Sequence, residues 1–325
     1  MVGTASRMSP AANVARVLER DDLGLLGIRR TTRIGRRFNG RRYGGCLQRR
    51  IDGVERHLAM IREARTADHG LEPTDGYLID DSQSLPHLDE AIADMEEVIA
   101  ERGGQRWEDV RKIFLQSILP ADGHLRYGSL VDFVTSPEVL EPVTEIAGFV
   151  PHLSEAQPRG IRLMESSTDH DPTPEVWRLS QFWHMDYHAT PTIYVIVAVR
   201  DIDPEDGPMH FLGAAASKRV AESLDYGARN SPYRVVDERV APLIDPDEVQ
   251  SFTGPAGTAL FLDSSRCFHF GSRNPRSRRY HLQYAYVSPV RNDFGDILRD
   301  GLDYPVGPED PPYRRLALDR TYLPA

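Results

Sequence analysis

The chain has 325 residues, 40% of them hydrophobic, which is enough for a sizeable core in one large domain or two smaller ones. Its 49 acidic residues outnumber 39 basic ones, and a net charge of -10 argues against a protein that binds nucleic acid over its whole surface. No window approaches the roughly 20 apolar residues of a membrane span, and the first residues lack a signal peptide's apolar run. Two cysteines are too few for a disulfide framework. We therefore expect a cytoplasmic protein with no membrane partner.

Positive charge is concentrated near the N-terminus, where nine arginines and no acidic residue lie between Arg29 and Arg50. Such a segment can bind phosphate groups or nucleic acid, or it can form a solvated surface paired with the acidic excess elsewhere. Ile34, Phe38 and Tyr43 interrupt the segment, and this interruption favours the solvated surface.

The first 125 residues are predicted to be mainly helical and to pack on the rest of the chain. Apolar residues recur at helical spacing from Val54 to Arg65 and from Leu88 to Ile99. A further helix is expected over 107–119, before a proline, and two short helices are expected over 129–148.

The pattern changes after Pro158 to short β-type segments separated by glycine and proline. Several short strands between turns are typical of a sandwich or barrel and not of a parallel α/β sheet. We therefore predict an α+β fold, with residues 1–125 as a helical layer and 126–325 as a jelly-roll (double-stranded β-helix, cupin-like) core. No flexible linker separates the two parts, so one integrated domain is expected. The predicted strands are Ile161–Met164, Trp177–His188, Thr192–Val199, Met209–Leu212, Thr258–Leu262 and Tyr280–Val287.

The segment QFWHMDYH, residues 181–188, carries the strongest functional signal. On an extended strand His184, Asp186 and His188 would point to one side, while Trp183 and Met185 would point to the other. A histidine and a carboxylate two residues apart can bind one metal ion from a single strand. The spacing is common by chance, however, and a strand histidine is more often an ordinary hydrogen-bonded residue.

A third ligand is available further along the chain, at His269. It follows an apolar strand that begins just after Gly257. Two neutral imidazoles and one carboxylate on one face of an octahedron leave open positions, which is the geometry of non-haem Fe(II) oxygenases. Arg276, Arg278 and Arg279 come next, and a guanidinium there could hold a dicarboxylate by a two-pronged salt bridge.

From about Tyr127 to Pro289 the chain resembles the phytanoyl-CoA dioxygenase-like family of Fe(II)- and 2-oxoglutarate-dependent oxygenases. The resemblance covers roughly half of the sequence. It lies in the ordered segments TSPEVLEPVTEIAG, QFWHMD, DIDPEDGPMHFLGAAAS, GTALFLDSSRCFHFGSRN and RRYHLQYAY.

The resemblance implies a metal site made of His184, Asp186 and His269, with Fe(II) as the metal and 2-oxoglutarate as cosubstrate. It also implies an arginine about ten residues after the last ligand, which favours Arg279 over Arg278, although a slip of one residue would reverse the choice. Thr192 and Tyr194 share a face of the next strand, and either could donate a hydrogen bond to 2-oxoglutarate or simply pack there. Gln181 could have a role in the pocket, and His188 could contact the substrate.

The implied activity is a dioxygenase that uses dioxygen to modify a small molecule, as in natural-product biosynthesis. Hydroxylation, oxidative cyclisation with C–O bond formation, desaturation and epimerisation all remain open, and a glycoside is one candidate substrate. The alternatives are a CoA-thioester hydroxylase of the same family, whose substrate phosphates the arginine segment would contact, and a non-catalytic β-sandwich binding protein. A nucleic-acid-binding scaffold is disfavoured by the acidity.

Overall fold

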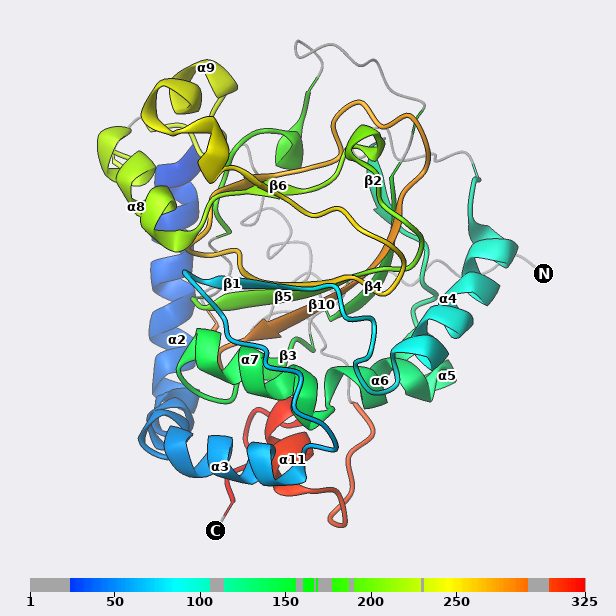
Figure 1. Cartoon of the computed structure of the whole chain (residues 1–325). Helices are drawn as coiled ribbons and strands as arrows, with labels where there is room; N and C mark the ends of the chain where they lie inside the picture. The colour runs from blue at the N-terminus through cyan, green and yellow to red at the C-terminus, as the bar shows by residue number, and fades with distance from the viewer. Residues whose placement is uncertain are drawn as a thin grey trace, which may run out of the picture.

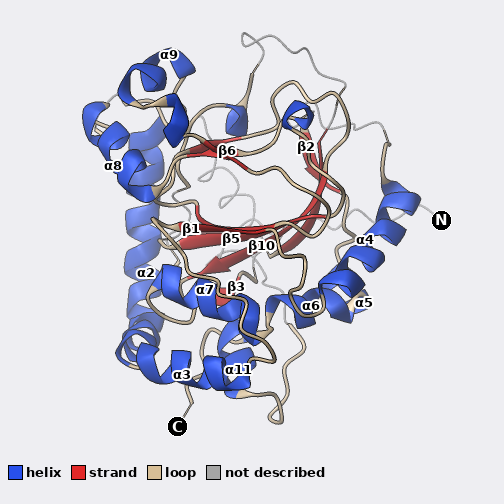
Figure 2. Ribbon diagram, in the orientation of Figure 1, coloured by secondary structure: helices blue, strands red, loops and turns tan. Residues whose placement is uncertain are grey.

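A seven-stranded antiparallel sheet forms the centre of the molecule (Figures 1 and 2). The computed structural model describes residues 24–105, 114–155, 160–166, 168, 177–186, 190–228, 231–291 and 304–324. The strand order is β1-β8-β5-β10-β4-β2, and β3 also pairs with β10. The strands are β1 (Tyr77–Asp80), β2 (Leu115–Ser117), β3 (His152–Leu153), β4 (Ile161–Ser166), β5 (Thr192–Ala198), β8 (Ala259–Asp263) and β10 (Tyr280–Val287).

A smaller sheet covers one face of the large one. It contains β6 (His210–Phe211) between β7 (Gln250–Ser251) and β9 (His269–Phe270), again antiparallel. In Figure 2 the small sheet and the helices α6 and α7 lie on opposite sides of β5 and β10. Both faces of the large sheet are therefore buried.

Helices surround this pair of sheets. In Figure 1, α7 lies against the large sheet, and α3 and α11 form a further layer beyond it, close to the C-terminus. The helices are α2 (Gly24–Asp52), α3 (Val54–Ala64), α4 (Leu88–Arg102), α5 (Gly123–Arg126), α6 (Gly128–Val134), α7 (Pro137–Ala147), α8 (Ala214–Ser223), α9 (Asp237–Val240) and α11 (Pro312–Leu318), with short 3-10 helices η4 (Leu179–Gln181), η5 (Pro204–Asp206), η6 (Ala241–Leu243) and η7 (Pro246–Glu248). No helix among the described residues is long and apolar enough to cross a membrane.

Alternation along the strands divides the apolar residues between two cores. On β5, Val195 and Val197 face the helices, while Tyr194 and Ile196 face the small sheet. On β10, Tyr284 faces the helices as well. Because successive side chains of a strand point to opposite faces, a strand covered on both sides is apolar throughout. All seven residues of β5 are accordingly buried.

Most of the predicted elements are confirmed, and two are wrong. The helices predicted near 54–65, 88–99 and 129–148 correspond to α3, α4 and α6–α7, and the mixture of helices with antiparallel sheets matches the α+β expectation. The helix over 107–119 is wrong at its end, because Leu115–Ser117 is an edge strand paired with β4. Residues 107–113 lie outside the described part.

The strand predicted over Trp177–His188 is also wrong. Within the described part of this range, 177–186, Leu179–Gln181 form η4 and only isolated bridges at Trp183 and His184 follow. The apolar residues Phe182 and Trp183 imitate a strand pattern, but a 3-10 turn held by Gln181 comes first.

Arg50 attaches α2 to the end of the chain. Its guanidinium is fully buried and donates hydrogen bonds to the carbonyl oxygens of Val150 and Leu316, both at 2.8 Å, and of Asp319 at 2.7 Å and Tyr322 at 3.3 Å. Burial lowers the pKa of Arg50. Its charge is thus balanced mainly by carbonyl dipoles, which the side chain holds in one arrangement.

Replacing Arg50 with methionine should lower the free energy of unfolding by about 2–4 kcal/mol, because several buried carbonyl groups lose their donor together. Urea denaturation measures the loss. Arg37→Met, at an exposed position of the same helix, should change stability by no more than about 0.5 kcal/mol. Equal losses in the two variants would contradict a role for the buried contacts.

Candidate metal centre

The two histidines predicted as ligands are paired across an antiparallel bridge. The His184 N–H donates to the His269 carbonyl at 3.1 Å, and the His269 N–H donates to the His184 carbonyl at 3.0 Å. His269 begins β9, whose other side pairs with β6. The N–H of Asp186 donates to the carbonyl of Ser264 at 2.9 Å, which fixes the carboxylate two residues beyond His184.

The three side chains converge on one point. Asp186 Oδ1 lies 3.9 Å from His184 Nε2, and Asp186 Oδ2 lies 3.9 Å from His269 Nε2. All three ligand atoms lie within 4.8 Å of one another, and all three residues are buried. Two atoms that each bind one ion at about 2.1 Å are at most about 4.2 Å apart, so small side-chain rotations bring the set onto a single metal.

Each imidazole is oriented by the backbone carbonyl two residues before it. His184 Nδ1 lies 2.9 Å from the carbonyl of Phe182, and His269 Nδ1 lies 2.9 Å from the carbonyl of Cys267. A carbonyl only accepts, so Nδ1 carries the proton in both rings. The lone pair on each Nε2 is then directed toward Asp186, which is the tautomer that metal binding requires.

The charge state of His184 also suits a metal ligand. Burial, followed by the neighbouring His269, lowers the pKa of His184 to about 3. The imidazole is therefore neutral at neutral pH. A set of two neutral nitrogen donors and one carboxylate oxygen fits a divalent transition metal such as ferrous iron.

The side of residues 183–186 that faces away from the three converging side chains is apolar, as the sequence predicts. Trp183 and Met185 belong to a buried cluster with Phe268 and Phe270, beside α8. The Trp183 and Phe270 rings meet edge to face, with centroids 4.5 Å apart. His188 lies outside the described residues.

Arg279 and Arg278 point to different surroundings. Arg279 is buried, and its two terminal nitrogens donate to the carbonyl of Gly207 and to Ser272 Oγ, the latter at 3.0 Å. Arg278 Nη1 instead lies 3.4 Å from Glu165 Oε1. Ser272 is three residues after the ligand His269, so Arg279 is the arginine that lies on the side of the metal centre.

The Nε group of Arg279 is not used within the part of the chain that the structure describes. Its Nε is buried and has no hydrogen-bond partner among the described residues. Burial lowers the pKa of Arg279 to about 10, which still leaves it charged at neutral pH. A buried cation with a free N–H fits a site that receives a carboxylate.

Thr192 and Tyr194 begin β5, and both are buried. The Thr192 carbonyl accepts from the N–H of Ser264, whose own carbonyl accepts from the N–H of Asp186. Thr192 is therefore two backbone hydrogen bonds from the metal centre. Tyr194 belongs to the core between the two sheets.

Two further residues shape the site: Gln181, whose role in the pocket the sequence leaves open, and Gly207, for whose contact the sequence gives no signal. Gln181 donates to the carbonyl of Ser272 at 2.8 Å and so joins the turn before His184 to the loop after His269. Gly207, which supplies the carbonyl for Arg279, has φ +62°, and a Cβ there would lie 2.4 Å from the carbonyl oxygen of Arg273. The GP dipeptide at Gly207 signals a turn, but not this contact.

Comparison with known proteins gives similar structures only. No family model matches the chain, and no curated protein matches it. The carbocyclase SnoK, a non-heme alpha ketoglutarate dependent enzyme from nogalamycin biosynthesis, is 18% identical, with a TM-score of 0.43 over 71% of this chain and 82% of its own. The epimerase SnoN, solved with Fe3+, alpha ketoglutarate and nogalamycin RO, is 16% identical, with a TM-score of 0.42 over 73% and 84%. EctD from S. alaskensis is 13% identical, with a TM-score of 0.41 over 66% and 73%.

Removing any one of the three converging side chains should abolish tight metal binding. We expect His184→Ala, Asp186→Ala and His269→Ala each to weaken Fe(II) or Co(II) binding at least about 100-fold, since loss of a direct ligand costs no less than loss of a group that orients one. Calorimetric metal titration checks this. His69→Ala, which removes a histidine from a loop, should bind the metal like the unaltered protein.

Proposed function

We propose that the protein is an Fe(II)- and 2-oxoglutarate-dependent oxygenase with a jelly-roll core, related to the phytanoyl-CoA dioxygenase-like family. The observation that carries the proposal is the buried convergence of His184, Asp186 and His269, each imidazole turned to present Nε2. Two histidines and one carboxylate hold three positions on one side of an iron ion and leave the others for cosubstrate and dioxygen.

When bound, ferrous iron and 2-oxoglutarate together supply the chemistry that activates dioxygen, with release of succinate and carbon dioxide. The chain supplies orientation and shielding from water. His184, Asp186 and His269 hold the iron. The Arg279 guanidinium, with its free Nε, binds the distal carboxylate of 2-oxoglutarate. Thr192 and Tyr194 are proposed to contact the cosubstrate from the start of β5.

We propose a polar small molecule as the substrate, modified in a natural-product pathway by hydroxylation or by oxidative cyclisation with C–O bond formation. His281 and Gln283 support a polar substrate. They alternate with Tyr280 and Leu282 along β10, so they share the face of Arg279 that is turned to the small sheet. Both can exchange hydrogen bonds with hydroxyl groups, such as those of a glycoside.

Formation of succinate tests the activity. The purified protein should convert 2-oxoglutarate to succinate only when Fe(II) and dioxygen are both present, and the Asp186→Ala variant should not. A mass-spectrometric screen of polar metabolites and CoA thioesters then looks for the gain of one oxygen atom or the loss of two hydrogen atoms. A wild-type protein that binds neither iron nor 2-oxoglutarate would leave only the non-catalytic binding protein.

The two adjacent arginines give a sharper test of the cosubstrate site. Arg279→Gln should raise the KM for 2-oxoglutarate about 100-fold, because a buried charge-assisted contact with the distal carboxylate is lost. Arg278→Gln should change it less than about threefold, since that side chain pairs with Glu165 instead. Succinate formed at varied 2-oxoglutarate concentration measures both values. If Arg278→Gln raised the KM for 2-oxoglutarate more than Arg279→Gln did, the distal carboxylate would be assigned to Arg278.

A further inference from the structure

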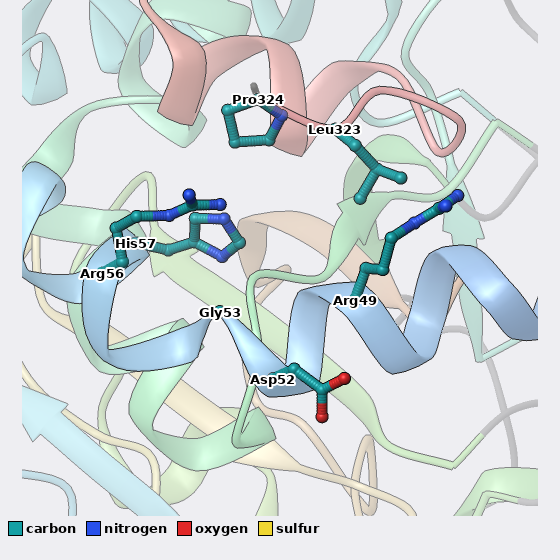
Figure 3. A pocket seen from close by; sticks show the side chains of 7 residues that line it. All are labelled: Arg49, Asp52, Gly53, Arg56, His57, Leu323 and Pro324. Carbon is teal, nitrogen blue, oxygen red and sulfur yellow. The ribbon is translucent and has the colours of Figure 1, made fainter.

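A cavity lies at the elbow between α2 and α3, where Leu323 and Pro324 lie over it (Figure 3). Its volume is about 390 Å³, and its lining residues are Arg49, Asp52, Gly53, Arg56, His57, Leu323 and Pro324. None of these belongs to the metal centre. The helix α3 packs on α7, which in turn contacts the large sheet, so α7 lies between this cavity and that sheet.

The charged side chains of the cavity are mainly basic. Figure 3 shows the Arg56 guanidinium beside the His57 ring, whereas Arg49 lies across the cavity with its guanidinium directed away from both. Asp52 points away from both Arg56 and His57 in the same view, and its Oδ1 accepts a hydrogen bond from Gln48 Nε2 at 2.8 Å. The Asp52 carboxylate is therefore hydrogen-bonded to Gln48 and directed away from Arg56 and His57. The two arginines give the cavity a positive potential.

His57 points to a missing partner. Its side chain is 1% exposed, and neither ring nitrogen has a hydrogen-bond partner among the described residues. Burial, followed by the charges of Arg56 and Arg50, lowers the pKa of His57 to about 4, so the ring is neutral at neutral pH and carries one N–H. Leaving a buried polar group unpaired is costly, and a ligand that accepts from His57 would remove this cost.

The start of α3 adds a further attraction for an anion. Gly53 caps this 11-residue helix without any side-chain hydrogen bond, so no capping side chain occupies the helix N-terminus, and the one acidic residue of the first turn is Glu55. A Cβ at position 53 would lie 3.0 Å from His57 Cε1 and 3.3 Å from His57 Nε2. The glycine thus allows the imidazole to lie directly against the beginning of the helix.

We propose that this cavity binds a phosphomonoester, with the phosphoryl group beside Arg56 and within reach of the His57 N–H, and with Arg49 adding positive charge from across the cavity. Guanidinium groups, a neutral imidazole and a helix N-terminus together provide the donors that phosphate oxygens accept from. The volume lies within the range of small-molecule sites, roughly 300–1,000 Å³, and exceeds what a bare ion needs. Leu323 and Pro324 offer an apolar wall for the organic part of the ligand.

Calorimetric titration of the full chain with phenyl phosphate, at constant ionic strength, tests the site. The unaltered protein should bind it saturably and more tightly than inorganic phosphate, because the ring gains contact with Leu323 and Pro324. The double variant Arg49→Gln/Arg56→Gln should bind at least about tenfold more weakly. The matched control Arg33→Gln/Arg37→Gln removes the same charge from positions of α2 that do not line the cavity, and it should bind like the unaltered protein.

Three titration results would overturn the proposal. They are no saturable binding of phenyl phosphate by the unaltered protein up to about 10 mM, an equal loss in both double variants, or phenol competing as well as phenyl phosphate. Ring ¹⁵N chemical shifts of His57 at neutral pH provide an independent check on folded, unaltered protein. They should move on saturation while those of His69 do not, and unchanged His57 shifts would place the ligand elsewhere. Neither measurement needs iron or 2-oxoglutarate, so failure here leaves the proposed oxygenase untouched.

Discussion

The candidate metal centre depends on one backbone register, the pairing of His184 with His269. Reciprocal hydrogen bonds at 3.1 and 3.0 Å place the two imidazoles side by side, with ring centroids 4.3 Å apart. A slip of one residue would turn one ring to the opposite face and replace it with an aromatic neighbour. The segment around His184 forms only isolated bridges, so the register must be secured by contacts outside the ladder.

Arg273 provides much of that security. Its Nε donates to the carbonyl of Gln181 at 2.6 Å, and its terminal nitrogens pair with both carboxylate oxygens of Asp237 at 2.8 and 2.9 Å. The guanidinium also lies 3.4 Å from the centre of the Phe270 ring. One side chain thereby connects the turn before the first ligand, the residue after the last ligand, and α9. Metal-binding residues that are fixed by such connected contacts change position little when other molecules bind to the metal or leave it.

The sequence was sufficient for the long periodic elements and for the identity of the converging residues. β10 and β5 are buried over their whole length, and their predicted bounds lie within one residue of the observed ones. The sequence also predicts the set His184, Asp186 and His269, which the structure brings together. The edge strands β1 and β2 were missed, because they have four and three residues and are mostly half-buried, which leaves no alternation to detect.

The choice between Arg278 and Arg279 shows a different limit. Adjacent residues on a strand point to opposite faces, and both are arginines. Residue type alone therefore cannot decide which of the two faces the small sheet. The side chain that distinguishes them is Glu165, which is fully buried on β4 and also accepts from Tyr280 at 2.9 Å. A residue that is distant along the chain thus pairs with Arg278 and leaves Arg279 on the face turned to the small sheet.

The position of β10 has a consequence for synthesis of the protein. It pairs with β5, β4 and β3, all of which precede it, yet it is the last strand of the described chain. All three partners have to wait for β10 to leave the ribosome, and β3 and β4, which come first along the chain, wait longest. Closing such long loops is entropically unfavourable, so the large sheet assembles late. Until then the apolar strands of the nascent chain have unpaired edges, which can aggregate. This is the stage at which chaperones have most to contribute.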